Sequence, residues 1–110
     1  SMADGFKDRG KGYEAKYQND QEMLFKITVR RNKLLGLWAA DQMGISGDKA
    51  ERYAKEVVAS DFEEAGDADV VRKVIGDMTG KGLEITEQAL RKEMDRLGAT
   101  AREQIEKTAS

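Results

Sequence analysis

The chain has 110 residues, of which 39% are apolar, 6% aromatic and 36% charged, so it forms at most one domain with one modest core. Cysteine and histidine are absent, which excludes disulfides, thiolate metal sites and the commonest general base near neutral pH. The net charge of −2 disfavours nucleic acid as a partner, and no apolar run approaches the ~20 residues that span a bilayer, so we expect a soluble intracellular protein.

Residues 1–18 are predicted to form a mobile amino-terminal arm. Three glycines lie within eight positions of this segment, and each costs a helix about 1 kcal/mol relative to alanine. Its few apolar residues, Phe6, Tyr13 and Tyr17, are spaced by seven and four positions and would share one face of a helix. Such a segment is a candidate for folding on binding, and the alternative is a tail that merely frays.

The first confident helix is predicted over residues 20–43, with Asn19 or Asp20 as its cap. Gly44 is suited to end it in the left-handed conformation. Gly36 lies inside this helix, which is unfavourable unless a neighbouring helix needs a close approach. The apolar positions recur at helical spacing, with Trp38 as the expected core anchor: Leu24, Ile27, Leu34, Leu35 and Trp38.

Three shorter helices are predicted at residues 47–65, 68–79 and 87–107, capped by Ser46, Asp67 and Thr86. Ile85 and Leu90 are placed to form a hydrophobic staple at the last of them. Each helix has one apolar stripe: Ala50, Ala54, Val57, Val58 and Phe62; then Val70, Val71, Val74, Ile75 and Met78; then Leu90, Met94, Leu97, Ala101 and Ile105. Short connections favour antiparallel neighbours, so we predict an all-α fold, a small four-helix bundle over residues 19–110 preceded by the arm.

No pattern in the sequence carries catalytic chemistry convincingly. The segment 76–84 resembles a phosphate loop, but its glycine spacing is one residue short and no strand precedes it, which favours a helix end. The acidic run over 61–69 lacks the spacing of a calcium loop and is interpreted as a helix end followed by a capped helix start. Arg30, Arg31 and Lys33 form a basic cluster that is expected to be solvated or paired with acids of another helix. We therefore predict neither an enzyme nor a metal site.

Two stretches taken together are more specific than these patterns: RRNKLLGLWAA at 30–40 and YAKEVVASDFEEAGDADVVRKV at 53–74. They resemble the zeta subunit, the ATPase inhibitor of the alphaproteobacterial F-type ATP synthase. RKEMDRL at 91–97 extends the resemblance, which covers residues 6–107. In the amino-terminal part, the matching positions are Phe6, Asp8, Arg9, Glu14, Lys16, Tyr17, Asp20, Glu22, Phe25 and Lys26.

The resemblance implies a four-helix bundle whose mobile amino-terminal region enters a catalytic alpha/beta interface of the ATPase head and blocks hydrolysis by stopping rotation. It makes the candidate partner-binding residues Phe6, Asp8, Arg9, Tyr13, Glu14, Lys16 and Tyr17. It implies no cofactor, and a cytoplasmic location, peripheral to the inner membrane through the synthase.

Gly10 and Gly12 depart from the resemblance, because the family commonly has helix-forming residues there. Together they would raise the cost of a helical arm by about 2 kcal/mol, which corresponds to roughly 30-fold weaker binding. Two alternatives to inhibition stay open: a bundle that binds ATP or ADP as a sensor, and a purely structural subunit of the same complex.

Overall fold

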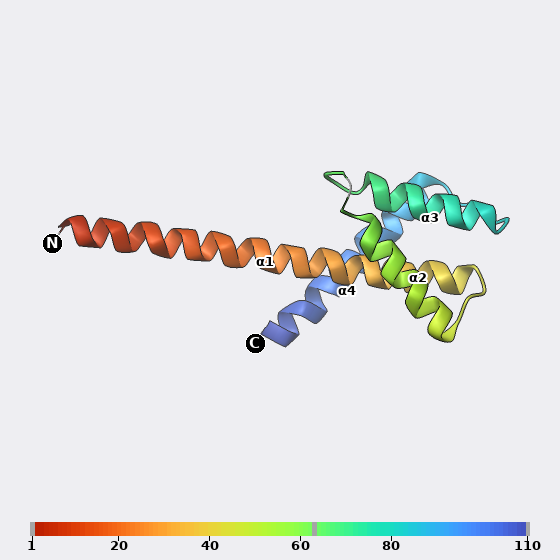
Figure 1. The fold of residues 1–110 in the computed structure, drawn as a ribbon, viewed down its shortest axis with the longest axis horizontal. Helices are drawn as coiled ribbons and strands as arrows, with labels where there is room; N and C mark the ends of the chain where they lie inside the picture. The colour runs from red at the N-terminus through yellow and green to blue at the C-terminus, as the bar shows by residue number, and fades with distance from the viewer. Residues whose placement is uncertain (1, 63, 110) are drawn as a thin grey trace.

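The structure is a computed structural model that describes the backbone of residues 2–62 and 64–109 and the side chains of 12–62 and 64–108. It consists of four helices: α1 (Met2–Gln42), α2 (Gly47–Ser60), α3 (Ala68–Gly80) and α4 (Glu87–Ala109). Within these ranges there is no strand, so the predicted all-α four-helix fold is confirmed. The three later helices gather around the carboxyl-terminal half of α1, while its amino-terminal half projects alone (Figure 1).

The predicted start of the first helix at Asn19 or Asp20 is wrong, because α1 runs without interruption from Met2 for 41 residues. A helix of this length measures about 60 Å, which accounts for most of the 68 Å longest dimension of the molecule. Glycine weakens a helix but does not break it as proline does, and the chain has no proline. A helix already nucleated by packing can therefore extend outward one hydrogen bond at a time.

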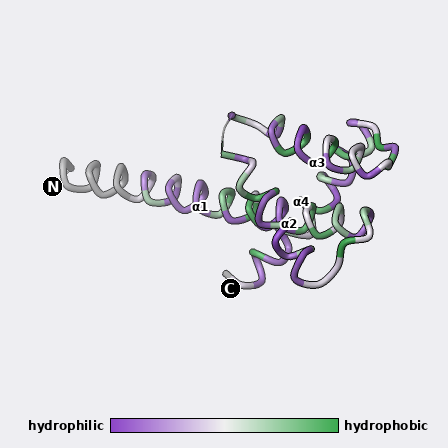
Figure 2. Tube along the Cα trace, turned by 45° about the vertical axis from the view of Figure 1, so that its right-hand side comes forward, coloured by the Kyte–Doolittle hydropathy of each residue, from purple (hydrophilic) through white to green (hydrophobic). Residues whose placement is uncertain are grey.

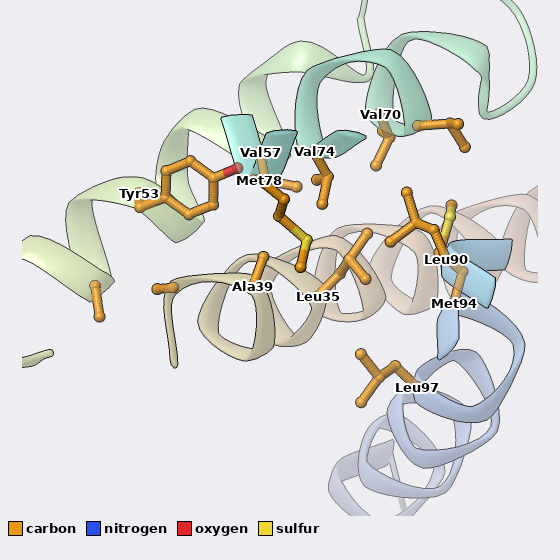
Figure 3. Packing of buried hydrophobic residues seen from close by; sticks show 13 residues of the cluster. Leu35, Ala39, Tyr53, Val57, Val70, Val74, Met78, Leu90, Met94 and Leu97 are labelled. Atoms are coloured by element: carbon orange, nitrogen blue, oxygen red, sulfur yellow. The ribbon is translucent and has the colours of Figure 1, made fainter. Parts of the chain in front are cut away.

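The main core lies where α2, α3 and α4 meet the second half of α1. Leu35 of α1 is completely buried, and Val57, Val74 and Leu90 point toward it from the other three helices (Figure 3). A smaller cluster joins Ile27 of α1 to Ala101 and Ile105 of α4. Figure 2 shows the hydrophobic segments concentrated where the helices converge, while the coloured turns of α1 that lead out of the bundle are mainly hydrophilic. α1 is thus the central helix, against which the other three pack.

Most predicted stripe residues are buried, and the exceptions are informative. The stripe of α4 is buried at all five positions. The predicted burial of Leu24 and Phe62 is wrong, since their side chains are 46% and 65% exposed. Leu24 lies on the part of α1 that leaves the bundle, and Phe62 lies beyond the end of α2 at Ser60. Trp38 is partly buried against the core, so Leu35 is the better anchor.

The helix ends follow the sequence signals in part. Gly44 has a φ of 75° after the end of α1, as predicted. The Thr86 hydroxyl accepts the Ala89 amide at 3.0 Å, which confirms this cap. Ser46 and Asp67 occupy N-cap positions, but neither side chain makes a capping hydrogen bond. The Asp67 carboxylate instead accepts a hydrogen bond from Arg31 of α1.

Candidate functional site

An exposed apolar row runs along the projecting part of α1. Tyr13 is 74% exposed, Tyr17 58% and Leu24 46%. Their spacing of four and seven positions places them on one helix face, and the next step of three reaches Ile27, which is buried against α4. The stripe that binds α1 to the bundle therefore continues outward, past the last helix that covers it.

The predicted partner-binding residues fall into two groups. Tyr13, Glu14, Lys16 and Tyr17 lie together on slightly more than one exposed turn of α1. Lys16 also pairs with Asp20 one turn further on, at 2.9 Å. The other three candidates, Phe6, Asp8 and Arg9, belong to the helical backbone of α1, but their side chains lie outside the described residues.

This part of the helix is suited to binding a partner protein. Burying a large apolar side chain contributes about 1.5–3 kcal/mol, and aromatic residues dominate the energetics of protein interfaces. The described turns thus offer a preformed helix face with apolar surface available to a partner.

A second exposed aromatic feature lies where α1 enters the bundle. The rings of Phe25 and Phe62 are 6.4 Å apart between centroids and tilted by 41°. Phe25 is 57% exposed, and Phe62 65%. Sequence reasoning missed this pair because Phe62 fitted the apolar period of the preceding helix. Its position within the acidic run DFEE was the signal that it lies outside the core.

A buried polar network holds the α2–α3 loop against α1, next to this aromatic pair. Arg31 donates to Asp67 at 2.7 Å and to the Asn32 side-chain oxygen at 2.9 Å. Asn32, only 1% exposed, donates to Asp61 at 2.8 Å. The prediction that the basic cluster pairs with acids of another helix is confirmed for Lys33, which lies 4.0 Å from Glu51 of α2. Arg31 pairs instead with Asp67 in the loop before α3. Among the described residues, no acidic group is arranged to hold a metal ion.

A third feature is a polar hollow of about 520 Å³ at the opposite end of the bundle. Three cationic side chains line it: Lys49 and Arg52 of α2, and Lys81 after α3. The phosphate-loop-like segment 76–84 supplies Lys81, but it is the last turn of α3 followed by a loop, as its failed spacing predicts. Glu56 of α2 also lines the hollow, so its charged lining is mixed but has an excess of positive charge.

The wall of this hollow contains a coupled polar cluster. The Tyr53 hydroxyl donates to Asp77 at 2.8 Å, and Lys73 lies 3.0 Å from Asp77 and 3.3 Å from Glu56. Burial, together with the bond to Asp77, raises the pKa of the Tyr53 hydroxyl well above its ordinary value. Burial lowers the pKa of Lys73, but bonds and charges from Asp77 and Glu56 outweigh it and raise that pKa. Tyr53 and Lys73 therefore both keep their protons at neutral pH.

None of the described helices combines the length and the apolar character needed to cross a membrane.

A comparison with curated proteins finds no match. Among solved structures, the chain is similar to a protein whose structure was determined in solution by NMR. The two are 50% identical with a TM-score of 0.70, and the match covers 78% of this chain and 98% of the other. The model of the family described as ATPase inhibitor subunit zeta matches residues 2–104, in agreement with the resemblance noted from the sequence. The chain, with its four helices and its exposed amino-terminal helix face, belongs to the ATPase inhibitor subunit zeta family.

Proposed function

We propose that the chain is a regulatory subunit that inhibits ATP hydrolysis by an F-type ATP synthase, and that the amino-terminal segment of α1 is its inhibitory element. The observation that carries this proposal is the exposure of Tyr13 and Tyr17 on a helix that projects from the bundle (Figure 1). Membership of an ATPase inhibitor family supports the inhibitory role.

The proposed mechanism is steric. The segment 1–18 enters a catalytic interface between the alpha and beta subunits of the head and stops rotation, while residues 19–110 remain outside as an anchor. Tyr13 and Tyr17 bury their rings in the interface, and Glu14 and Lys16 pair with charges on its walls. Phe6, Asp8 and Arg9 extend the contact toward the amino terminus. This mechanism needs no catalytic group, cofactor or metal in the chain, and it places the protein at the cytoplasmic side of the inner membrane, bound to the synthase.

Because Tyr13 and Tyr17 are exposed and neither ring contributes to the core, replacing them tests inhibition without disturbing the fold. In the full chain, Tyr13→Ala with Tyr17→Ala removes two rings, each worth about 1.5–3 kcal/mol if fully buried in the complex. We expect at least a 100-fold increase in the concentration that half-inhibits a purified alphaproteobacterial ATPase head. Lys92→Ala, an exposed change on α4, serves as the matched control.

Circular dichroism should show the same helix content for both variants. Deletion of residues 1–18 should abolish inhibition altogether. Full inhibition by the double variant or by the deleted chain would contradict the arm mechanism. Tight binding to the head without any change in hydrolysis would instead indicate a purely structural subunit.

A second candidate function is adenine nucleotide binding, which the polar hollow favours. Lys49, Arg52 and Lys81 line it against one carboxylate, that of Glu56, and its volume of about 520 Å³ leaves room for a phosphate group. Titration of the ¹⁵N-labelled chain with ATP or ADP should shift amides near these residues, and Arg52→Ala should weaken the response. The absence of localised shifts at millimolar nucleotide would exclude this function.

A further inference from the structure

An apolar groove of about 350 Å³ runs along α1 where the helix enters the bundle. Three helices supply its floor, with Val29 from α1, Val58 from α2 and Ile105 from α4. The α1 residues that line it span positions 25–33, a length of about 12 Å or just over two turns. The groove therefore has the direction and length of a short helical segment.

The rim of this groove is basic. Lys26, Arg30 and Lys33 line it, all from α1. Arg30 donates to the neutral amide of Gln104 at 2.8 Å, and Lys33 lies 4.0 Å from Glu51. Lys26 has no ion pair with any side chain that the structure describes. The three positive charges are thus weakly compensated within the chain and are available to an anionic partner.

One aromatic ring lines the groove. Phe25 borders both the groove and a second hollow of about 340 Å³. Its ring lies 6.4 Å, between centroids, from that of Phe62, whose loop is held to α1 through Asn32 and Asp61. This contact restricts the Phe25 ring before any partner arrives, which lowers the entropic cost of binding.

We propose that this groove docks an amphipathic helix with acidic flanks that belongs to the ATP synthase head, an inference that rests on the proposed function. The apolar floor accepts side chains at positions i, i+3 or i+4 and i+7 of such a helix. The aspartates and glutamates that flank the docked helix pair with Lys26, Arg30 and Lys33.

Two other occupants fit the groove less well. The chain's own amino-terminal segment continues α1 as an unbroken helix and is carried away from the groove (Figure 1). A second copy packed groove to groove would bring the same three cations against each other across a two-fold axis. Charge complementarity therefore favours a partner that is acidic where this chain is basic.

The groove and the arm then have separable effects. Docking in the groove retains the chain on the head, and the arm blocks the catalytic interface. A defect in the groove should lower affinity but leave inhibition complete once the head is saturated. A defect in the arm should leave ATP hydrolysis uninhibited even when the head is saturated with the chain.

The test uses the full chain, a purified alphaproteobacterial ATPase head and two groove variants, Lys26→Glu and Phe25→Ala. We expect each to raise the dissociation constant about tenfold, with residual hydrolysis at saturation equal to that of the wild type. Lys26→Glu should also reduce the salt dependence of binding. Lys92→Glu, the same charge reversal on an exposed position of α4, should bind like the wild type.

A photo-crosslinking residue at position 26 identifies the occupant directly. We expect it to label an acidic, amphipathic peptide of the head, whereas the same group at position 92 should not. If the wild type binds and inhibits the head and both groove variants bind it with the same affinity, the groove proposal is overturned and the arm mechanism is not affected. Failure of the wild type to bind the head at all would overturn both proposals. Self-association that Phe25→Ala abolishes in sedimentation would show that a second copy occupies the groove.

Discussion

Gly36 of α1 lies so close to Ala54 of α2 that a Cβ added at Gly36 would stand 2.6 Å from the Ala54 Cα. The glycine therefore sets how closely these two helices cross, and the close approach suggested by its place inside a helix is confirmed. Its neighbours Leu35 and Ala39 belong to the main core, so the spacing of the crossing affects the whole domain.

Gly36→Ala is expected to destabilise the protein by about 1–3 kcal/mol, because the added methyl group meets backbone and cannot be relieved by rotating a side chain. Urea unfolding followed by circular dichroism measures this loss. Gly76→Ala is the matched control: a Cβ there meets nothing within 4 Å, and alanine should stabilise α3 by up to about 1 kcal/mol. Equal effects of the two substitutions would contradict the close-crossing argument.

Asn32→Ala is expected to cost about 2–3 kcal/mol. The change leaves Asp61 without its donor and removes one acceptor from Arg31, and one oxygen of Asp61 is already buried without a hydrogen bond. Glu103→Ala breaks an exposed ion pair with Lys107 and should change stability by less than about 0.5 kcal/mol. Thermal unfolding of both variants distinguishes a buried network from surface charge.

Tyr53 should make the protein less stable at alkaline pH. The pKa of the Tyr53 hydroxyl is raised in the folded state. The stability that this protonated hydroxyl contributes is therefore complete below its ordinary pKa of 10.0 and is lost progressively as the pH rises above that value. At pH 11 the unfolded chain gains about 1.4 kcal/mol from ionising this tyrosine, which the folded chain does not. Lys73 acts in the same direction, since its pKa is also raised.

The measurement compares unfolding free energies of the wild type and Tyr53→Phe between pH 9 and pH 11. The variant should lose the hydrogen bond to Asp77 at all pH values, about 1 kcal/mol, but should decline less steeply with pH. Parallel curves would mean that Tyr53 ionises normally in the folded protein.

Gly12→Ala should leave inhibition nearly unchanged. Position 12 lies within α1, and an added Cβ there meets nothing within 4 Å. Alanine favours the helix by about 1 kcal/mol, but α1 is already helical at this position in the free chain, so the gain applies to the free and the bound segment alike. Titration of ATP hydrolysis measures the concentration that half-inhibits the head, and inhibition weakened by up to roughly fivefold would show that the bound segment is not helical at that point.

Local signals in the sequence were sufficient for the helices that pack in a regular way. The stripe of α4 alternates steps of four and three over five positions, and every one of them is buried. Its cap at Thr86 and the left-handed Gly44 were equally readable, because such signals act within one turn of the chain. The match of residues 2–104 to the inhibitor family likewise confirms what the motifs indicated.

The sequence by itself thus determined an all-helical chain with one apolar face per helix, since helical periodicity and capping depend on neighbours a few residues away. Only the tertiary structure decided where those faces stop being covered: Phe62 and Leu24 have the right spacing but no helix above them. The extension of α1 to Met2, the diversion of Asp67 from capping to Arg31, and the groove beside Phe25 also depend on packing between distant segments. Contacts of this kind join residues far apart in the sequence, such as Arg31 and Asp67, so no local pattern in the sequence can report them.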